Sequence, residues 1–198
     1  MTSFRTLAAM LLVLGGTAIA HADPSDVVVT AGATPPAEPT TYVQLGGVAG
    51  LDDHGFLAGG ALDAGRAIGH HLWLHGRFAA GGQDDPSFSD SAPSYSGEFV
   101  QARLGVEARG CANLYACAFV GADVGVTHGQ MSDRMDVVTH TDVGVFARGG
   151  LDLGSRSFRV RPELDLGFGS VTHSPTTHPT TSIGLDGGTL SLGFAYLW

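Results

Sequence analysis

Strict alternation of apolar and polar residues is the clearest pattern in this sequence, and it is strongest in residues 158–168, FRVRPELDLGF. Every second position is apolar, while the positions between are charged or glycine. Successive side chains of a β-strand point to opposite faces, so the pattern predicts a strand with one apolar and one polar face. Residues 100–109, VQARLGVEAR, repeat the arrangement. Pro162 has no amide hydrogen, so we expect it to break one ladder bond or lie at a bulge.

Weaker versions of this pattern fill the rest of the chain from Thr41, and no convincing helix is predicted. Eight strands are expected, at 42–51, 56–66, 71–81, 98–109, 117–127, 137–151, 157–170 and 182–198. Short links follow the second, fourth and sixth strands, and long polar segments follow the third, fifth and seventh. The link at 52–55 is short although it lies on the long-loop side. Alternating connections of this kind are typical of an up-and-down sheet.

The first 40 residues show a different pattern of apolar and polar positions. Arg5 precedes the apolar run LAAMLLVLGGTAIA, and Ala20-His21-Ala22 has the small-x-small pattern of a signal-peptidase site. The run is shorter than the roughly 20 apolar residues of a transmembrane helix. We therefore expect residues 1–22 to be a cleaved signal peptide, residues 23–40 to be a disordered periplasmic tail rich in Pro, Ala and Thr, and residues 41–198 to form one β domain.

A soluble secreted β-sandwich would show the same alternation with its faces reversed. Three features favour a membrane barrel instead: the export leader, the even number of strands with alternating links, and an apolar row that continues to the last residue. The fold class expected is therefore all-β, an eight-stranded antiparallel up-and-down transmembrane barrel. The sandwich, acting as a binding module, stays as an alternative.

The final strand carries large apolar residues at alternating positions up to a terminal aromatic: Leu190, Leu192, Phe194, Tyr196 and Trp198. This row resembles the signal that the outer-membrane assembly machinery reads on its substrates, and 41–198 resembles in plan the small eight-stranded outer-membrane barrels of the OmpA/OmpX class. The resemblance implies a bacterial outer-membrane protein with both termini in the periplasm, in contact with lipid and lipopolysaccharide. Ile183 and Leu185 are out of phase with this row, which predicts a bulge at Gly187-Gly188.

Charge changes the picture of the interior. The chain has 10 basic residues, all arginine, against 19 acidic ones, a balance that argues against binding nucleic acid. An eight-stranded barrel is just wide enough for side chains to fill. Alternation places six cations and seven anions inside: Asp63, Arg77, Arg103, Glu107, Arg109, Asp123, Asp142, Arg148, Arg159, Arg161, Glu163, Asp165 and Asp186. Near balance predicts that these groups pair and close the lumen, giving a non-conducting barrel.

Cysteine and histidine supply the remaining candidate chemistry. Cys111 and Cys117 flank a turn on the periplasmic side, where a disulfide is expected. His71 and His75 are expected on the inward face with Trp73. Five further histidines are expected among the acidic outer loops: His54, His128, His140, His173 and His178. A weaker hypothesis is that these loops bind divalent cations that bridge lipopolysaccharide. None of the nine histidines has metal-ligand spacing, so no metal and no cofactor is expected.

The sequence thus favours a monomeric structural or surface-interaction protein, with residues 83–97 as the outward contact. The alternative from another class is an enzyme that hydrolyses or transfers acyl groups on lipid A. His173, Ser174 and His178, with Glu163 in the same segment, supply the residue types for it. Neighbouring residues of a strand point to opposite faces, however, and a Pro-Thr-Thr loop is a poor platform for an aligned nucleophile and base.

Overall fold

The computed structural model describes residues 39–52, 55–85, 95–113, 115–132, 137–173, 180–181 and 185–198. These residues form strands β1 Thr41–Asp52, β2 Gly55–Ala67, β3 Leu72–Asp85, β4 Tyr95–Asn113, β5 Ala116–Ser132, β6 Val137–Gly154, β7 Phe158–His173, β8 Thr180–Thr181 and β9 Leu185–Leu197. The expected leader and most of the expected tail lie outside the described residues. No helix long and apolar enough to span a membrane occurs in the described part of the chain.

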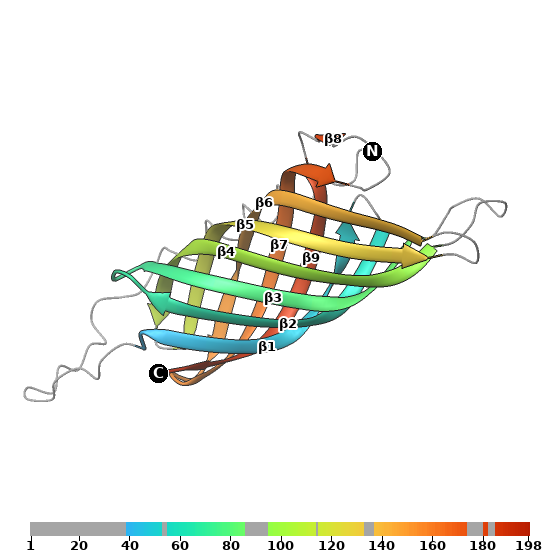
Figure 1. Ribbon diagram of the computed structural model, residues 1–198. Helices are drawn as coiled ribbons and strands as arrows, with labels where there is room; N and C mark the ends of the chain where they lie inside the picture. The colour runs from blue at the N-terminus through green and yellow to red at the C-terminus, as the bar shows by residue number, and fades with distance from the viewer. Residues whose placement is uncertain are drawn as a thin grey trace, which may run out of the picture.

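Eight long strands close into a barrel (Figure 1). Each strand from β1 to β7 pairs antiparallel with the next, and β9 lies between β7 and β1. The two-residue β8 pairs only with the end of β7. Trp198 is held at the seam, where its amide donates to the carbonyl of Thr41 at 3.0 Å and its carbonyl accepts from Thr40 at 2.9 Å. The predicted all-β, eight-stranded antiparallel barrel is confirmed.

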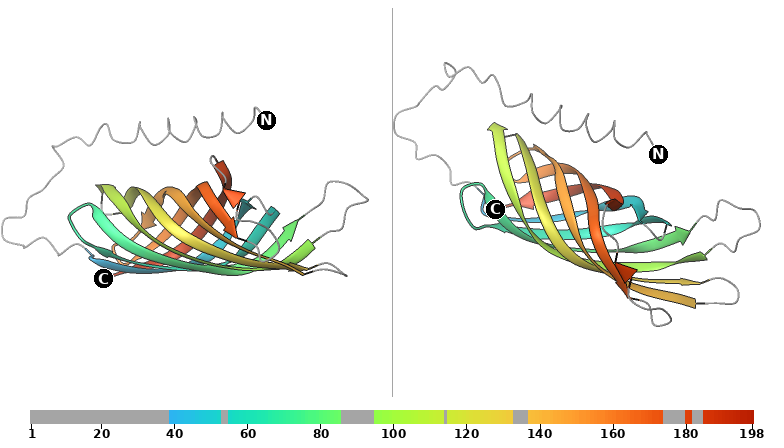
Figure 2. Two further views of the ribbon diagram at one scale, coloured as in Figure 1. Left: turned by 45° about the horizontal axis from the view of Figure 1, so that its top comes forward. Right: turned by 90° about the horizontal axis from the view of Figure 1, so that it is seen from above.

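Several strands are longer than the sequence pattern predicts. β4 has 19 residues, β5 has 17 and β6 has 18, and their ends project beyond β1 and β2 at the long-loop end (Figure 2). The predicted strands stopped where the apolar row stopped. Backbone pairing continues because the ladder does not depend on an apolar face: Ser132 still pairs with Ser96 and with Val137. The long loops are correspondingly shorter than predicted.

The barrel is polar inside and apolar outside. Along β5 the buried residues alternate with exposed ones such as Val120 at 66% and Val124 at 59%. A β-sandwich would bury these apolar residues between two sheets. The structure has a single closed sheet that buries charges instead, so the sandwich alternative is wrong.

Three register shifts and one ladder break interrupt the wall among the described strands, and the first shift lies between Cys111 and Asn113 at the β4–β5 turn. Gly187 pairs with Gly167 while Leu185 pairs with Phe168, so the extra residue of β9 is Asp186, one position before the predicted Gly187-Gly188 bulge. A second bulge lies at Gly169, whose φ of 64° is a conformation that favours glycine. The β6–β7 register is also interrupted between Glu163 and Val160, beside Pro162 as expected.

Candidate functional site

The middle of the lumen is filled by an ion layer, contributed by six strands. Twelve charged side chains are buried: Arg77, Arg103, Arg109, Arg148, Arg159, Arg161, Asp63, Glu107, Asp123, Asp152, Glu163 and Asp165. Six arginines therefore meet six carboxylates. An unpaired buried charge is strongly destabilising, so this equality allows the charges to be buried together in the lumen.

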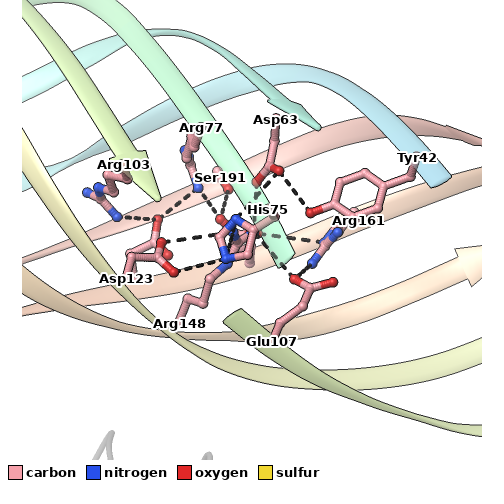
Figure 3. Close-up of polar contacts among 12 residues, drawn as sticks. Tyr42, Asp63, His75, Arg77, Arg103, Glu107, Asp123, Arg148, Arg161 and Ser191 are labelled. Atoms are coloured by element: carbon pink, nitrogen blue, oxygen red, sulfur yellow. Dashed lines mark hydrogen bonds and ion pairs between the residues drawn. The ribbon is translucent and has the colours of Figure 1, made fainter. Parts of the chain in front are cut away.

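Arg148 of β6 is the centre of the ion layer (Figure 3). Its Nη2 donates to Asp63 Oδ2 at 2.9 Å and also to Glu163, while its Nη1 lies 2.6 Å from His75 Nδ1. On the other side of the imidazole, His75 Nε2 lies 3.0 Å from Asp123 Oδ1. One guanidinium and one histidine thus link strands β2, β3, β5, β6 and β7 across the barrel.

Two further groups of ion pairs lie around this centre. Toward the long-loop end, Arg77 contacts Glu163 and Asp165, and Arg103 Nη1 lies 3.3 Å from Asp165 Oδ2. Toward the short turns, Glu107 accepts from Arg161 and from Arg109, the latter at 2.6 Å. Strands β4 and β7 supply most of these residues because each carries charges at consecutive inward positions.

Apolar clusters lie above and below the ion layer. On the long-loop side the cluster consists of Val48, Leu57, Ala61, Ala79 and Phe99. On the short-turn side it consists of Tyr42, Trp73, Ala195 and Leu197. The Arg109 guanidinium lies 4.2 Å from the centroid of Trp73, and the hydroxyl of Tyr42 donates to Asp63 at 2.8 Å. Aromatic faces and a hydroxyl therefore join the lower cluster to the charges above it.

Eleven of the thirteen residues expected in the lumen are among the buried charges. Asp142 is different because its side chain is 14% exposed, with Oδ2 3.7 Å from His140 Nε2. The side chain of Asp186 lies outside the described residues. Alternation missed Asp152, which is 1% exposed and reaches both Arg109 and Arg161. The predicted strand ends at residue 151, but β6 continues through Gly154 and keeps the same phase.

Four of the expected histidine positions need correction. His75 is buried next to Trp73 as expected, but His71 is exposed, because the turn ends at this residue and β3 begins only at Leu72. His140, expected in a loop, is buried inside β6, and His128 and His173 lie on strands β5 and β7. His54 and His178 lie outside the described residues. In the described ranges no group of three or more His, Cys, Asp and Glu side chains is arranged to hold a metal ion.

Cys111 and Cys117 form the expected disulfide across the β4–β5 turn. Cys117 is buried and points inward, where Arg159 Nη1 donates to its sulfur at 2.8 Å. The bond therefore ties the turn to the lower end of the lumen.

The outer face carries an apolar belt. On β5 the outward residues from Ala118 to Val126 are all apolar, and beyond them come His128 and Gln130. Nine residues is within the roughly 9–11 that a tilted strand needs to cross a bilayer. The last strand contributes an exposed row in which Phe194 is 68% exposed, and Tyr196 lies 5.0 Å from Phe158 and 5.6 Å from Trp198 between ring centroids.

Comparisons with known proteins agree with this architecture. The chain matches no protein-family model, and no curated protein matches it in sequence. Among solved structures it is similar to Ail, the attachment invasion locus protein of Yersinia pestis, with 14% identity and a TM-score of 0.54 over 82% of this chain and 100% of Ail. Neisserial surface protein A is similar with 14% identity and a TM-score of 0.53, over 80% of this chain and 97% of that one. The outer membrane protein AlkL is similar with 13% identity and a TM-score of 0.53, over 85% and 94%. The fold is therefore that of small eight-stranded outer-membrane barrels.

Proposed function

We propose that this protein is an integral barrel of the bacterial outer membrane, with a structural or surface-interaction role and a closed lumen. The observation that carries the proposal is the reversed polarity of the barrel: leucine, valine and phenylalanine side chains face outward while twelve charges are buried inside. Exposing so many apolar side chains to water would be unfavourable, whereas placing them in hydrocarbon is favourable. In hydrocarbon every backbone group must also be paired within the protein, which a closed barrel achieves.

The same polarity supports an orientation. Beyond the apolar belt, Val137 of β6 is 62% exposed, but most outward residues on the projecting ends of β3 to β6 are polar: Asp84, Ser96, Glu98, His128, Gln130, Ser132, Thr139 and Thr141. We place this end outside the cell and the short turns, with both termini, in the periplasm. Tyr196 and Trp198 then lie near the headgroups, where amphipathic rings are favoured. The row from Leu190 to Trp198 is our candidate signal for the assembly machinery.

The closed lumen supports a role other than conduction. The ion layer has equal numbers of cations and carboxylates, and apolar clusters lie on both sides of it. A path for ions would have to break several buried ion pairs and cross both clusters. We therefore propose a non-conducting monomer that acts through its outer surface, in contact with lipid and lipopolysaccharide.

Ail has been solved in complex with the heparin analogue sucrose octasulfate. Recognition of a sulfated sugar needs cations on the surface. Of the arginines in the described ranges only Arg66 and Arg156 are not buried, and the chain carries a net charge of −9. Arg134 lies outside the described residues, and sulfate binding is therefore not extended to this chain.

The position of Glu163 argues against the alternative that this protein is an enzyme acting on lipid A. Glu163, one of its candidate residues, has a fully buried side chain in the lumen and contacts Arg77 and Arg148. A carboxylate held between arginines inside the barrel cannot reach a lipid on its outer face. Ser174 and His178 lie outside the described residues.

Mobility on a gel tests the proposal directly. The mature chain, refolded in detergent, should migrate differently before and after boiling, and it should stay out of solution in buffer without detergent. In planar bilayers at neutral pH it should carry no steady current. A water-soluble monomer would overturn the membrane assignment, and steady current would overturn the closed lumen while leaving the membrane assignment intact.

A further inference from the structure

The two sulfurs of the disulfide between Cys111 and Cys117 have different surroundings. The cysteines lie directly opposite one another in the β4–β5 ladder, at the short-turn end of the barrel. Cys111 is exposed, whereas Cys117 is only 2% exposed. A reagent that arrives from the short-turn end therefore reaches Cys111 and not Cys117.

Arg159 lies beside the buried sulfur. Its Nη1 donates to Cys117 Sγ at 2.8 Å, and its Nε donates to the carbonyl of Ser155 at 3.3 Å. The second bond ties the guanidinium to the β6–β7 turn and so helps to hold it against the sulfur. A disulfide sulfur is a weak acceptor, whereas a thiolate carries a full negative charge and accepts far more strongly from a guanidinium. The contact therefore becomes stronger when the disulfide opens with the charge on Cys117.

One carboxylate also faces this sulfur, because Asp152 lies opposite Cys117 in the β5–β6 ladder. Its oxygens lie 3.3 Å from Arg109 Nε and 3.6 Å from Arg161 Nε, and it also attracts Arg159. The negative charge of Asp152 is thus compensated by several cations and does not exclude a second anion. A neighbouring cation favours the thiolate, and a thiol that ionises readily is a good leaving group in disulfide exchange.

We propose that Cys111 is a site of reversible thiolation by small thiols, with Cys117 as the leaving group and Arg159 as the residue that stabilises it. The thiolate of the small thiol forms a new S–S bond with Cys111 Sγ. The bond between Cys111 and Cys117 breaks, and its electron pair stays on Cys117 Sγ as a thiolate held by the guanidinium. One disulfide replaces another, so the step needs no further oxidant or reductant. Attack of the Cys117 thiolate on Cys111 re-forms the original bond and releases the small thiol.

The position of the adduct tests the proposal on the unaltered chain. The folded, oxidised barrel in detergent micelles is treated briefly with glutathione at neutral pH and quenched with acid. It is then alkylated in denaturant with N-ethylmaleimide and cleaved with chymotrypsin at Tyr115, which lies between the two cysteines. Mass spectrometry should find about ten times more glutathione on Cys111 than on Cys117, because access selects the sulfur that is attacked. The chain unfolded in guanidinium chloride, where both sulfurs are accessible, should lose this preference.

Substitutions at the short-turn end test the role of Arg159. R159Q should slow the opening of the disulfide by glutathione about ten-fold, because the departing sulfur loses its cation. R159K keeps the positive charge and should retain most of the rate. R156Q is the matched control, because Arg156 lies in the same β6–β7 turn and contacts neither sulfur in the described part of the chain; it should open at the wild-type rate. The order of rates should be the same with uncharged 2-mercaptoethanol, and R159M replaces R159Q if the latter does not fold.

The location of this site in the periplasm rests on the proposed orientation, whereas the exchange itself depends only on the contacts around the two sulfurs. Glutathione found equally on both cysteines, or no adduct on a barrel with a heat-modifiable band, would overturn the thiolation site and leave the membrane barrel standing. Equal rates for R159Q and R156Q would overturn the role of Arg159. A water-soluble chain that still forms the adduct on Cys111 would overturn the membrane assignment alone.

Discussion

Arg148 is the residue on which the interior depends most. Its guanidinium contacts Asp63 at 2.9 Å and Glu163, and its side chain is fully buried. Replacing it with methionine keeps the volume but leaves two buried carboxylates without their shared partner. Breaking a buried pair from one side typically destabilises a protein by about 3–5 kcal/mol. We expect R148M to lower the free energy of unfolding of the barrel by a similar amount, measured by urea titration in lipid vesicles.

Arg66 provides the matched control, because it is an exposed arginine on β2. R66M should change the midpoint little, since exposed substitutions rarely exceed about 0.5 kcal/mol. Adding E163Q to R148M should recover part of the loss by removing one of the stranded charges. Equal midpoints for R148M and R66M would mean that the ion layer is not paired as described.

At the scale of single elements, the β4–β5 turn offers a second test. The disulfide between Cys111 and Cys117 closes a loop with a sequence separation of 6. Loop-closure entropy for so short a loop gives about 2 kcal/mol of stabilisation. C111S/C117S should therefore fold with a lower urea midpoint. Alkylation should add mass to the wild-type chain only after reduction; alkylation before reduction would rule out the bond.

The sequence predicts these elements well where side-chain alternation positions them, and less well where backbone pairing does. Alternation predicts the eight strands and most inward charges because a period of two assigns every side chain to a face. It fails where the apolar face ends before the strand does, as at His128, and at Asp152, where β6 continues past the predicted end of the strand. The bulge at Asp186 lies one residue before the glycines that signalled it, because register is set by pairing with β7. Which inward charges meet one another depends on the three-dimensional arrangement of six strands, for which the sequence has no local signal.

For the whole molecule, closure between β1 and β9 decides whether the barrel exists, and a pair of adjacent glycines tests it. A Cβ at Gly46 would meet the backbone of the last strand, within 2.6 Å of Gly193 Cα, whereas a Cβ at Gly47 has only the Gly59 carbonyl at 3.7 Å. G46V should therefore prevent closure, and the protein should lose its heat-modifiable band. G47V places the same side chain on the outer face and should fold, since the apolar belt accepts another valine. If both variants assembled equally well, the seam between the first and last strands would not be as tight as the structure has it. If G47V alone failed, the outer face would not be lipid-facing at this point.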